Sequence, residues 1–125
     1  MFEIDVEESF AAGHALRGYI GKCENLHGHN YKVRLTVAGD GLDPIGLLCD
    51  FKDVKSLLSK VTDRLDHQYL NEVEPFKELN PSAENLARYL FRETNLLVSS
   101  ATRGRACVKR VKVWETDQNA VSYIE

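Results

Sequence analysis

Apolar and polar residues alternate along two stretches in the first third of the chain. Phe2, Ile4 and Val6 alternate with acidic residues, and the apolar side resumes at Phe10 after an expected bulge at residues 8–9. From residue 31 to 37 every second residue is tyrosine, valine or leucine, with polar residues between them. This is the period of a half-buried strand. We therefore predict two strands, joined by a glycine-containing turn segment.

Two later stretches carry apolar residues at helical spacing. Asp50 is placed to cap a helix whose apolar positions continue to about Leu65. Asn80 and Pro81 are placed as the cap and first residue of a second helix, which is expected to give way to a loop at residues 99–104.

Alternation returns at residues 110–114, and a closing strand is expected at residues 121–124. The short apolar run 46–49 is expected to form a brief additional strand. The main order is strand, strand, helix, helix, strand, strand. It predicts an α+β fold, a four-stranded antiparallel sheet with both helices packed on one face.

Length, composition and charge limit the number of domains and the classes of binding partner. A chain of 125 residues predicts one domain over residues 1–125. The net charge of −3 gives no electrostatic footprint for nucleic acid or an anionic membrane, and no apolar run approaches the length of a membrane span. The three cysteines are odd in number and widely spaced, and the acidic start differs from a secretory signal. We therefore expect a cytoplasmic protein with a small-molecule or protein partner.

Histidines supply the strongest chemical signal. His27 and His29 flank Gly28 at the entry to the second strand, where residues two apart point to the same face. His14, at the end of the first strand, would lie beside them if the two strands pair. Three imidazoles with an open fourth position are typical of a catalytic zinc site. Cys23 is close enough to be a fourth ligand, or an unligated thiol that acts as a base near the cation.

Other candidates lie further along the chain. Asp66 and His67 form either a carboxylate–imidazole relay, which needs irregular backbone there, or an ordinary polar helix end. Glu115 shares the parity of Val111 and Val113, so its carboxylate should face inward and needs a partner: a salt bridge, or a ligand with paired N–H donors. The remaining thiols, Cys49 and Cys107, are expected to be packed.

Taken together, these residues resemble the family of 6-pyruvoyl- and 6-carboxy-tetrahydropterin synthases over nearly the whole chain. The motifs that carry the resemblance are Phe10-x-x-x-His14, Cys23-x-x-x-His27-Gly28-His29-Asn30-Tyr31, Leu65-Asp66-His67, residues 80–85 (Asn-Pro-Ser-Ala-Glu-Asn) and Glu115. The resemblance implies the tunnelling fold, assembled as trimers that pair into a homohexamer with active sites at subunit interfaces.

The resemblance also implies a role for each residue. His14, His27 and His29 would hold Zn²⁺, and Cys23 would abstract a proton. Asp66 and His67 would return one. Glu115 would anchor the pterin, with Ser82 and Glu84 contributed by a neighbouring subunit. The implied substrate is 7,8-dihydroneopterin triphosphate.

The implied product depends on the segment before the histidines. Three residues separate Cys23 from His27, which resembles the bacterial 6-carboxy-tetrahydropterin synthases of queuosine and other 7-deazapurine biosynthesis. Animal-type pyruvoyl synthases are longer there. The neighbouring Glu24 resembles a dual-function subgroup that also forms 6-hydroxymethyl-dihydropterin for folate synthesis, or it is a surface residue. The alternative of another class is a non-catalytic domain with a structural zinc held by Cys23 and the three histidines.

Overall fold

The computed structural model describes residues 1–125 as five strands, two α-helices and two short 3₁₀ turns. In chain order they are β1 (Phe2–His14), η1 (Lys22–Glu24), β2 (His27–Gly39), α1 (Phe51–Thr62), β3 (Gln68–Tyr69), η2 (Leu70–Glu72), α2 (Ala83–Thr102), β4 (Cys107–Trp114) and β5 (Ala120–Ile124).

All strands belong to one sheet in the order β3-β1-β2-β4-β5. The long strands β1 and β2 pair antiparallel over their whole length, with Phe10 opposite Tyr31 and His14 opposite His27. The prediction of an α+β fold is therefore confirmed, but the four-stranded antiparallel sheet is wrong in detail. The fifth strand, β3, pairs parallel with the end of β1. Two residues are too few to show any alternation, so the sequence gives no signal for it.

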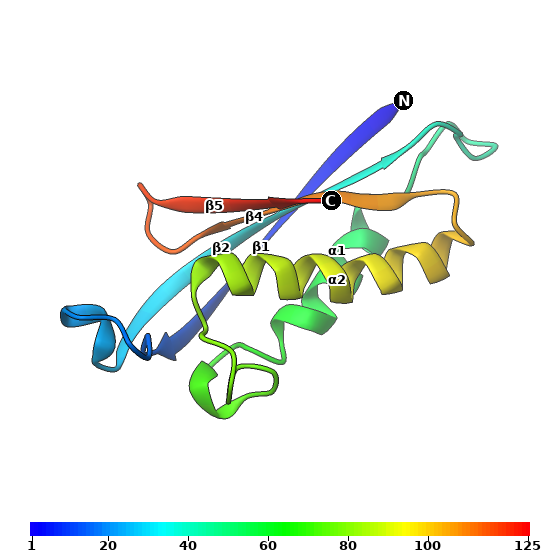
Figure 1. Ribbon diagram of the computed structural model, residues 1–125. Coiled ribbons are helices and arrows are strands. Elements are labelled where there is room, and N and C mark those ends of the chain that lie inside the picture. Colours follow the sequence, from blue (N-terminus) through cyan, green and yellow to red (C-terminus); the bar gives the residue numbers. More distant parts are fainter.

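Both helices lie on one face of the sheet, as predicted, and leave the other face bare (Figure 1). A core cluster of 23 buried residues fills the space between the layers. The alternating residues of β2, from Tyr31 to Val37, and the apolar stripes of α1 and α2 all contribute to it. Burying these two amphipathic faces against each other stabilises the layered arrangement.

Several predicted boundaries move. Residues 46–49 are irregular and form no strand, and α1 ends at Thr62, followed by turns over residues 63–67. β1 continues without a bulge through residue 14. The sheet irregularity lies instead between β2 and β4, at Thr36 and Val37.

The second helix differs at both ends. Its cap is Ser82, whose hydroxyl accepts a hydrogen bond from the Asn85 amide at 3.2 Å. Asn80 is used elsewhere, because its side chain bridges the backbone N–H and C=O of Arg17, each at 2.9 Å. The predicted loop at 99–104 is helical through Thr102, and the helix ends where Arg103 adopts the left-handed conformation at φ 53°.

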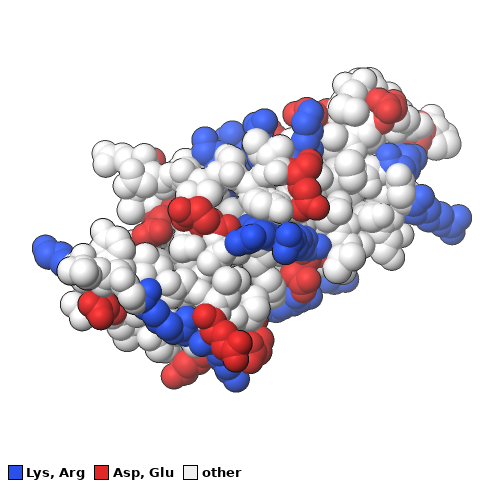
Figure 2. Space-filling model, in the orientation of Figure 1, with Lys and Arg blue, Asp and Glu red and all other residues white.

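The surface carries mixed charge. In Figure 2, lysines and arginines are interspersed with acidic groups on the visible face. No helix is both long and apolar enough to cross a bilayer. Cys49 packs against the core, as predicted, whereas Cys107 is exposed at the start of β4, so the expectation of a packed thiol there is wrong.

Candidate metal centre and active site

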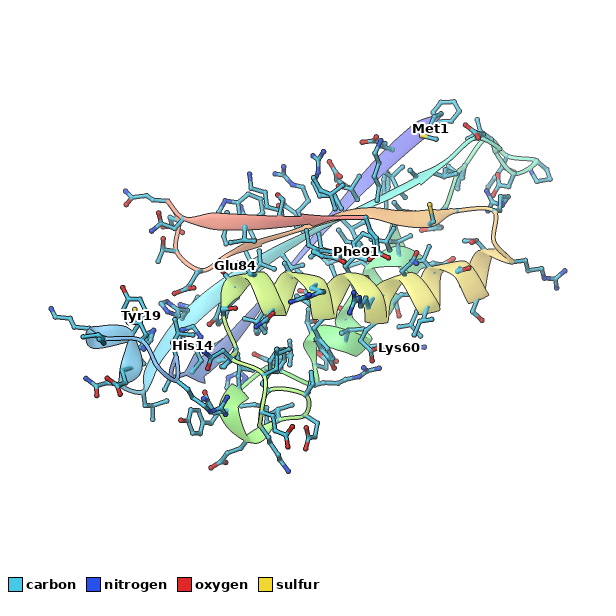
Figure 3. The ribbon with its side chains drawn as sticks, in the orientation of Figure 1. Met1, His14, Tyr19, Lys60, Glu84 and Phe91 are labelled. Carbon is cyan, nitrogen blue, oxygen red and sulfur yellow. The ribbon has the colours of Figure 1, made fainter.

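The three predicted histidine ligands converge at one end of the sheet. His14 ends β1 and His27 begins β2 directly opposite it, while His29 lies two residues further on the same face. One side-chain nitrogen from each, together with a carboxylate oxygen of Glu115, all lie within 4.8 Å of one another. Figure 3 shows His14 at the end of β1, close to the start of α2. The grouping predicted from strand parity is therefore present.

Backbone carbonyls orient two of the imidazoles. His14 Nδ1 lies 2.7 Å from the Pro81 carbonyl oxygen, and His27 Nδ1 lies 2.7 Å from that of Asn25. A carbonyl can only accept, so each Nδ1 carries the proton that it donates. In the neutral ring the other nitrogen, Nε2, is then bare, that is, unprotonated with a free lone pair. This is the arrangement in which an outer hydrogen bond fixes a metal-ligating histidine.

The two bare nitrogens face each other. His14 Nε2 and His27 Nε2 are 3.0 Å apart. Two lone pairs at this distance repel unless a proton or a cation lies between them. His14 is fully buried, and this burial lowers its pKa below the ordinary value, which disfavours the proton. Two ligands of a tetrahedral zinc ion lie about 3.3 Å apart, so the pair fits a metal with little movement.

His29 provides independent support for a metal. Its Nε2 is buried and has no hydrogen-bond partner. A Glu115 carboxylate oxygen lies 3.0 Å away, but outside the direction in which the ring could donate to it. Burial also lowers the pKa of His29, so the ring is neutral near neutral pH. A buried imidazole nitrogen without a partner is costly, and a metal ion would satisfy it.

Tyr31 closes the buried side of the centre, and sequence analysis missed it. Its hydroxyl lies 3.2 Å from His14 Nδ1, and burial raises its pKa, which keeps the phenol protonated.

Sequence analysis also missed Asn71. Its side chain bridges the N–H and C=O of Ala15, at 2.9 and 2.8 Å, and so fixes the chain just after His14. Asn71 lies 56 residues from Ala15 in the sequence, so no local signal could have identified the pairing.

Cys23 lies in η1, within the segment that joins β1 to β2. The Leu16 amide donates to the Cys23 carbonyl at 2.8 Å, which ties the two sides of this segment together. The thiol is partly buried and is not among the atoms that converge on the histidines. The structure thus leaves Cys23 outside the ligand group, where Glu115 is the fourth member. Glu24, beside it, is exposed.

Asp66 and His67 meet in the way that the relay interpretation requires. His67 has a left-handed backbone with φ 59°, and its Nδ1 lies 3.0 Å from Asp66 Oδ2. The Ala11 amide donates to Asp66 Oδ1 at 2.9 Å and is the main reason that the pKa of Asp66 is lowered. An open cavity of about 500 Å³ is lined by both His67 and His29. His14, His27 and Glu115 do not line this cavity, whose lining from β1 and β2 includes Gly13, Gly28 and Asn30, on the face away from the helices, so within one chain only His29 links the relay pair to the histidine centre.

The remaining predicted residues lie near the start of α2. Glu84 is exposed, whereas Ser82 is partly buried and its hydroxyl caps the helix. Glu84 and Glu115 line the same small cavity of about 140 Å³, beside the β4–β5 turn. The structure thus brings Glu84 to the predicted pterin anchor within one chain.

Comparison with known proteins identifies the protein family. The sequence profile described as 6-pyruvoyl tetrahydropterin synthase matches residues 3–125. The chain belongs to this family.

Its relatives include both named activities. The 6-carboxy-5,6,7,8-tetrahydropterin synthases of Haemophilus influenzae and Bacillus subtilis are 34% and 32% identical; their alignments cover 100% and 98% of this chain and 100% and 84% of theirs. The 6-pyruvoyl tetrahydrobiopterin synthase of Dictyostelium discoideum is 34% identical over 82% of this chain and 73% of its own.

Solved structures agree with the fold. The 6-pyruvoyl tetrahydropterin synthase of Caenorhabditis elegans superposes with a TM-score of 0.86 at 30% identity, covering 99% of this chain and 95% of that one. The predictions of the family and of a lyase-type enzyme are therefore confirmed.

Proposed function

We propose that this chain is a zinc-dependent lyase that converts 7,8-dihydroneopterin triphosphate to 6-carboxy-5,6,7,8-tetrahydropterin, acetaldehyde and triphosphate, a step of queuosine and other 7-deazapurine biosynthesis. The observation that carries the proposal is the pair of bare, facing Nε2 atoms of His14 and His27 beside the unpartnered Nε2 of His29. The relatives named 6-carboxy-5,6,7,8-tetrahydropterin synthase support this choice of product.

His14, His27 and His29 would hold the zinc ion. When bound, the ion would act as a Lewis acid that lowers the pKa of substrate hydroxyl groups. The Pro81 and Asn25 carbonyls keep two of the rings in the required tautomer, and burial keeps His14 and His29 neutral. A neutral imidazole is the form that binds metal.

Proton transfer is assigned to Cys23, Asp66 and His67. Cys23 is the proposed base, since it lies outside the ligand group. His67 is the proposed acid, with Asp66 holding its Nδ1 and leaving the opposite ring nitrogen for the substrate. His67 is largely exposed, with 82% of its side chain accessible, so it can exchange protons with water.

Glu115 is the proposed pterin anchor, because a carboxylate can accept paired N–H donors from an amino-pyrimidine edge. Ser82 is proposed to contribute from a neighbouring subunit, whereas Glu84, expected from there as well, is proposed to contribute beside Glu115 of its own chain, because the two carboxylates line one cavity. We propose that residues 1–125 form one tunnelling-fold domain that assembles into a homohexamer. The sheet has unpaired outer edges, along β5 and along most of β1, at which copies could join.

The product assay tests the proposal. Zinc-loaded protein is incubated with 7,8-dihydroneopterin triphosphate and the products are analysed by mass spectrometry. We expect 6-carboxy-tetrahydropterin and acetaldehyde. Pyruvoyl product alone would overturn the assignment of the reaction.

The Cys23→Ala variant tests the base. We expect turnover to fall by at least about 10²-fold, while the metal content stays at the wild-type level. Loss of the metal together with the thiol would make Cys23 a ligand and contradict its proposed role.

A second candidate is pyruvoyl- or hydroxymethyl-forming activity, alone or in addition. The Dictyostelium relative favours the first, and the exposed Glu24 beside Cys23 favours the second. If Glu24 supports 6-hydroxymethyl-dihydropterin formation, Glu24→Gln should remove that product and spare the carboxy product. The structural-zinc alternative is disfavoured, because the fourth group at the histidines is Glu115 instead of Cys23.

A further inference from the structure

The bare face of the sheet carries three cationic side chains around one aromatic ring. Lys32 Nζ lies 4.2 Å from the centre of the Trp114 ring, Lys112 Nζ 4.8 Å and the Arg34 guanidinium carbon 5.1 Å. These four residues, here called the cation cluster, lie on β2 and β4. They alternate with core residues such as Val33 and Val113, so they face away from the helices.

The register of β2 against β4 places the members of the cluster directly opposite one another. Lys32 pairs across the sheet with Trp114, and in the next row Arg34 pairs with Lys112. Like charges directly opposite each other on neighbouring strands are destabilising. The π face of Trp114 offsets part of the repulsion, since a cation over an exposed ring gains about 0.5–1 kcal/mol. The arrangement still concentrates three positive charges beside one ring.

Acidic neighbours neutralise only a part of this charge. Glu7 forms an ion pair with Arg34 at 2.8 Å, whereas Lys32 and Lys112 have no acidic partner. The other acidic side chains of β1 on this face are already engaged: Glu3 with Lys109 at 2.7 Å, and Asp5 with the Thr36 hydroxyl. The cluster therefore keeps an excess of positive charge on a protein whose net charge is −3.

A cavity of about 260 Å³ opens beside the cluster. It is lined by Lys32 and Trp114, together with Asn30, Thr116 and Asp117. The Asp117 carboxylate repels an anion, so a bound anion should lie at the Lys32 side of the cavity. Asn30 also lines the larger cavity that contains His29 and His67. The cation cluster thus adjoins this larger cavity along the bare face of β2, opposite to the face that carries the histidine centre.

We propose that the cation cluster is a binding site for a condensed phosphate, such as triphosphate. Three cations gathered around one ring match several adjacent negative charges, which a single carboxylate does not offer. Two sources have this chemistry: free inorganic triphosphate, and the triphosphate tail of the proposed substrate. The proposal of an anion site stands on charge and register alone, and only the second source rests on the proposed function.

Tryptophan fluorescence gives a direct readout, because Trp114 is the single tryptophan of the chain. We expect inorganic triphosphate to change its emission saturably, with weaker binding at higher salt and weaker binding of orthophosphate. The Lys32→Gln/Lys112→Gln double variant should raise the Kd for triphosphate at least tenfold. Lys60→Gln, which removes an exposed lysine from α1 (Figure 3), is the matched control and should leave the Kd unchanged.

Calorimetry provides a second measurement that does not depend on the fluorophore. If calorimetry detects no triphosphate binding, or detects binding that the double variant leaves intact, the proposal is wrong.

Steady-state kinetics then separates the two sources. A raised KM for 7,8-dihydroneopterin triphosphate in the double variant would assign the site to the substrate tail, whereas an unchanged KM with lost triphosphate binding would assign it to the free anion. Absence of turnover in the wild type would contradict the proposed function and leave the binding result standing.

Discussion

The two faces of β2 gather basic side chains in different ways. On the face toward the helices, His27 and His29 join His14, and on the bare face Lys32 and Arg34 join Lys112. Both groups crowd like side chains together. The imidazoles are partly or fully buried, and desolvation lowers the pKa of His14 and His29. The lysines and the arginine are only partly buried.

Burial therefore decides what each face can bind. Neutral imidazoles in a low-dielectric setting offer lone pairs, and the group that resolves their crowding is a cation. Charged ammonium and guanidinium groups offer N–H donors and positive potential, and the group that resolves their crowding is an anion. Two sites of opposite preference thus follow from the alternation of one strand.

The largest expected effect comes from removing a ligand on the buried face. His29→Ala should lower metal affinity by more than the roughly 10–100-fold that loss of an outer hydrogen-bond partner costs. Metal analysis after dialysis and a metal-dependent melting curve would measure it. With chelator, the variant should melt no lower than wild type, because it loses a buried nitrogen that has no hydrogen bond. Asn30→Ala, the next residue on the other face, is the control, and equal metal loss there would contradict the assignment.

A smaller effect is expected from Tyr31→Phe. The change removes the hydroxyl that lies 3.2 Å from His14 Nδ1 but leaves the Pro81 carbonyl to hold the same N–H. We therefore expect about a tenfold loss of metal affinity, the lower end of the range for an outer partner, and about 1 kcal/mol of stability. Competition with a metallochromic chelator measures the first and urea denaturation the second. An unchanged affinity would show that Pro81 alone fixes the ring.

The buried face could largely be predicted from sequence, because parity and spacing are local. The period of two placed His27 and His29 on one face and, separately, Glu115 on the side of Val113, and the motif resemblance named their chemistry; the strand register shows that the two faces are the same. What the sequence could not show is what holds them. The Pro81 and Asn25 acceptors are backbone carbonyls, which every residue has.

Long-range partners were missed for a similar reason. Asn80 has the sequence context of a helix cap, yet it bonds to Arg17, 63 residues away. The cation cluster was missed because like charges become neighbours only when the register of β2 against β4 is known.

A pH titration of the metal-free protein should sharpen the contrast further. The folded pKa values of His14 and His29 are lowered, so near pH 6 the unfolded chain, with a histidine pKa of about 6.5, binds more protons than the folded one. Their contribution to stability is therefore present above about pH 6.5 and lost as the pH falls from there through the lowered folded values. Denaturant unfolding with chelator, followed downward from neutral pH, would measure the loss. A free energy of unfolding that does not change with pH would contradict this prediction. The His29→Ala variant should show a smaller loss of stability than the wild type.

The smallest expected effect is on the bare face and has the opposite sign. Lys112→Gln removes one of two like charges that lie directly opposite each other, while Lys32 and Arg34 remain against the Trp114 ring. The repulsion that is relieved and the cation–π contact that is lost are each below about 1 kcal/mol, so we expect a net gain of a few tenths of a kcal/mol at low salt. The gain should disappear near 1 M salt, where the screening length falls to about 3 Å. Urea denaturation at the two salt concentrations measures it, with Lys60→Gln as the control. A loss of stability at low salt would show that the ring contact outweighs the repulsion, and the crowding of charge would then need no anion to explain it.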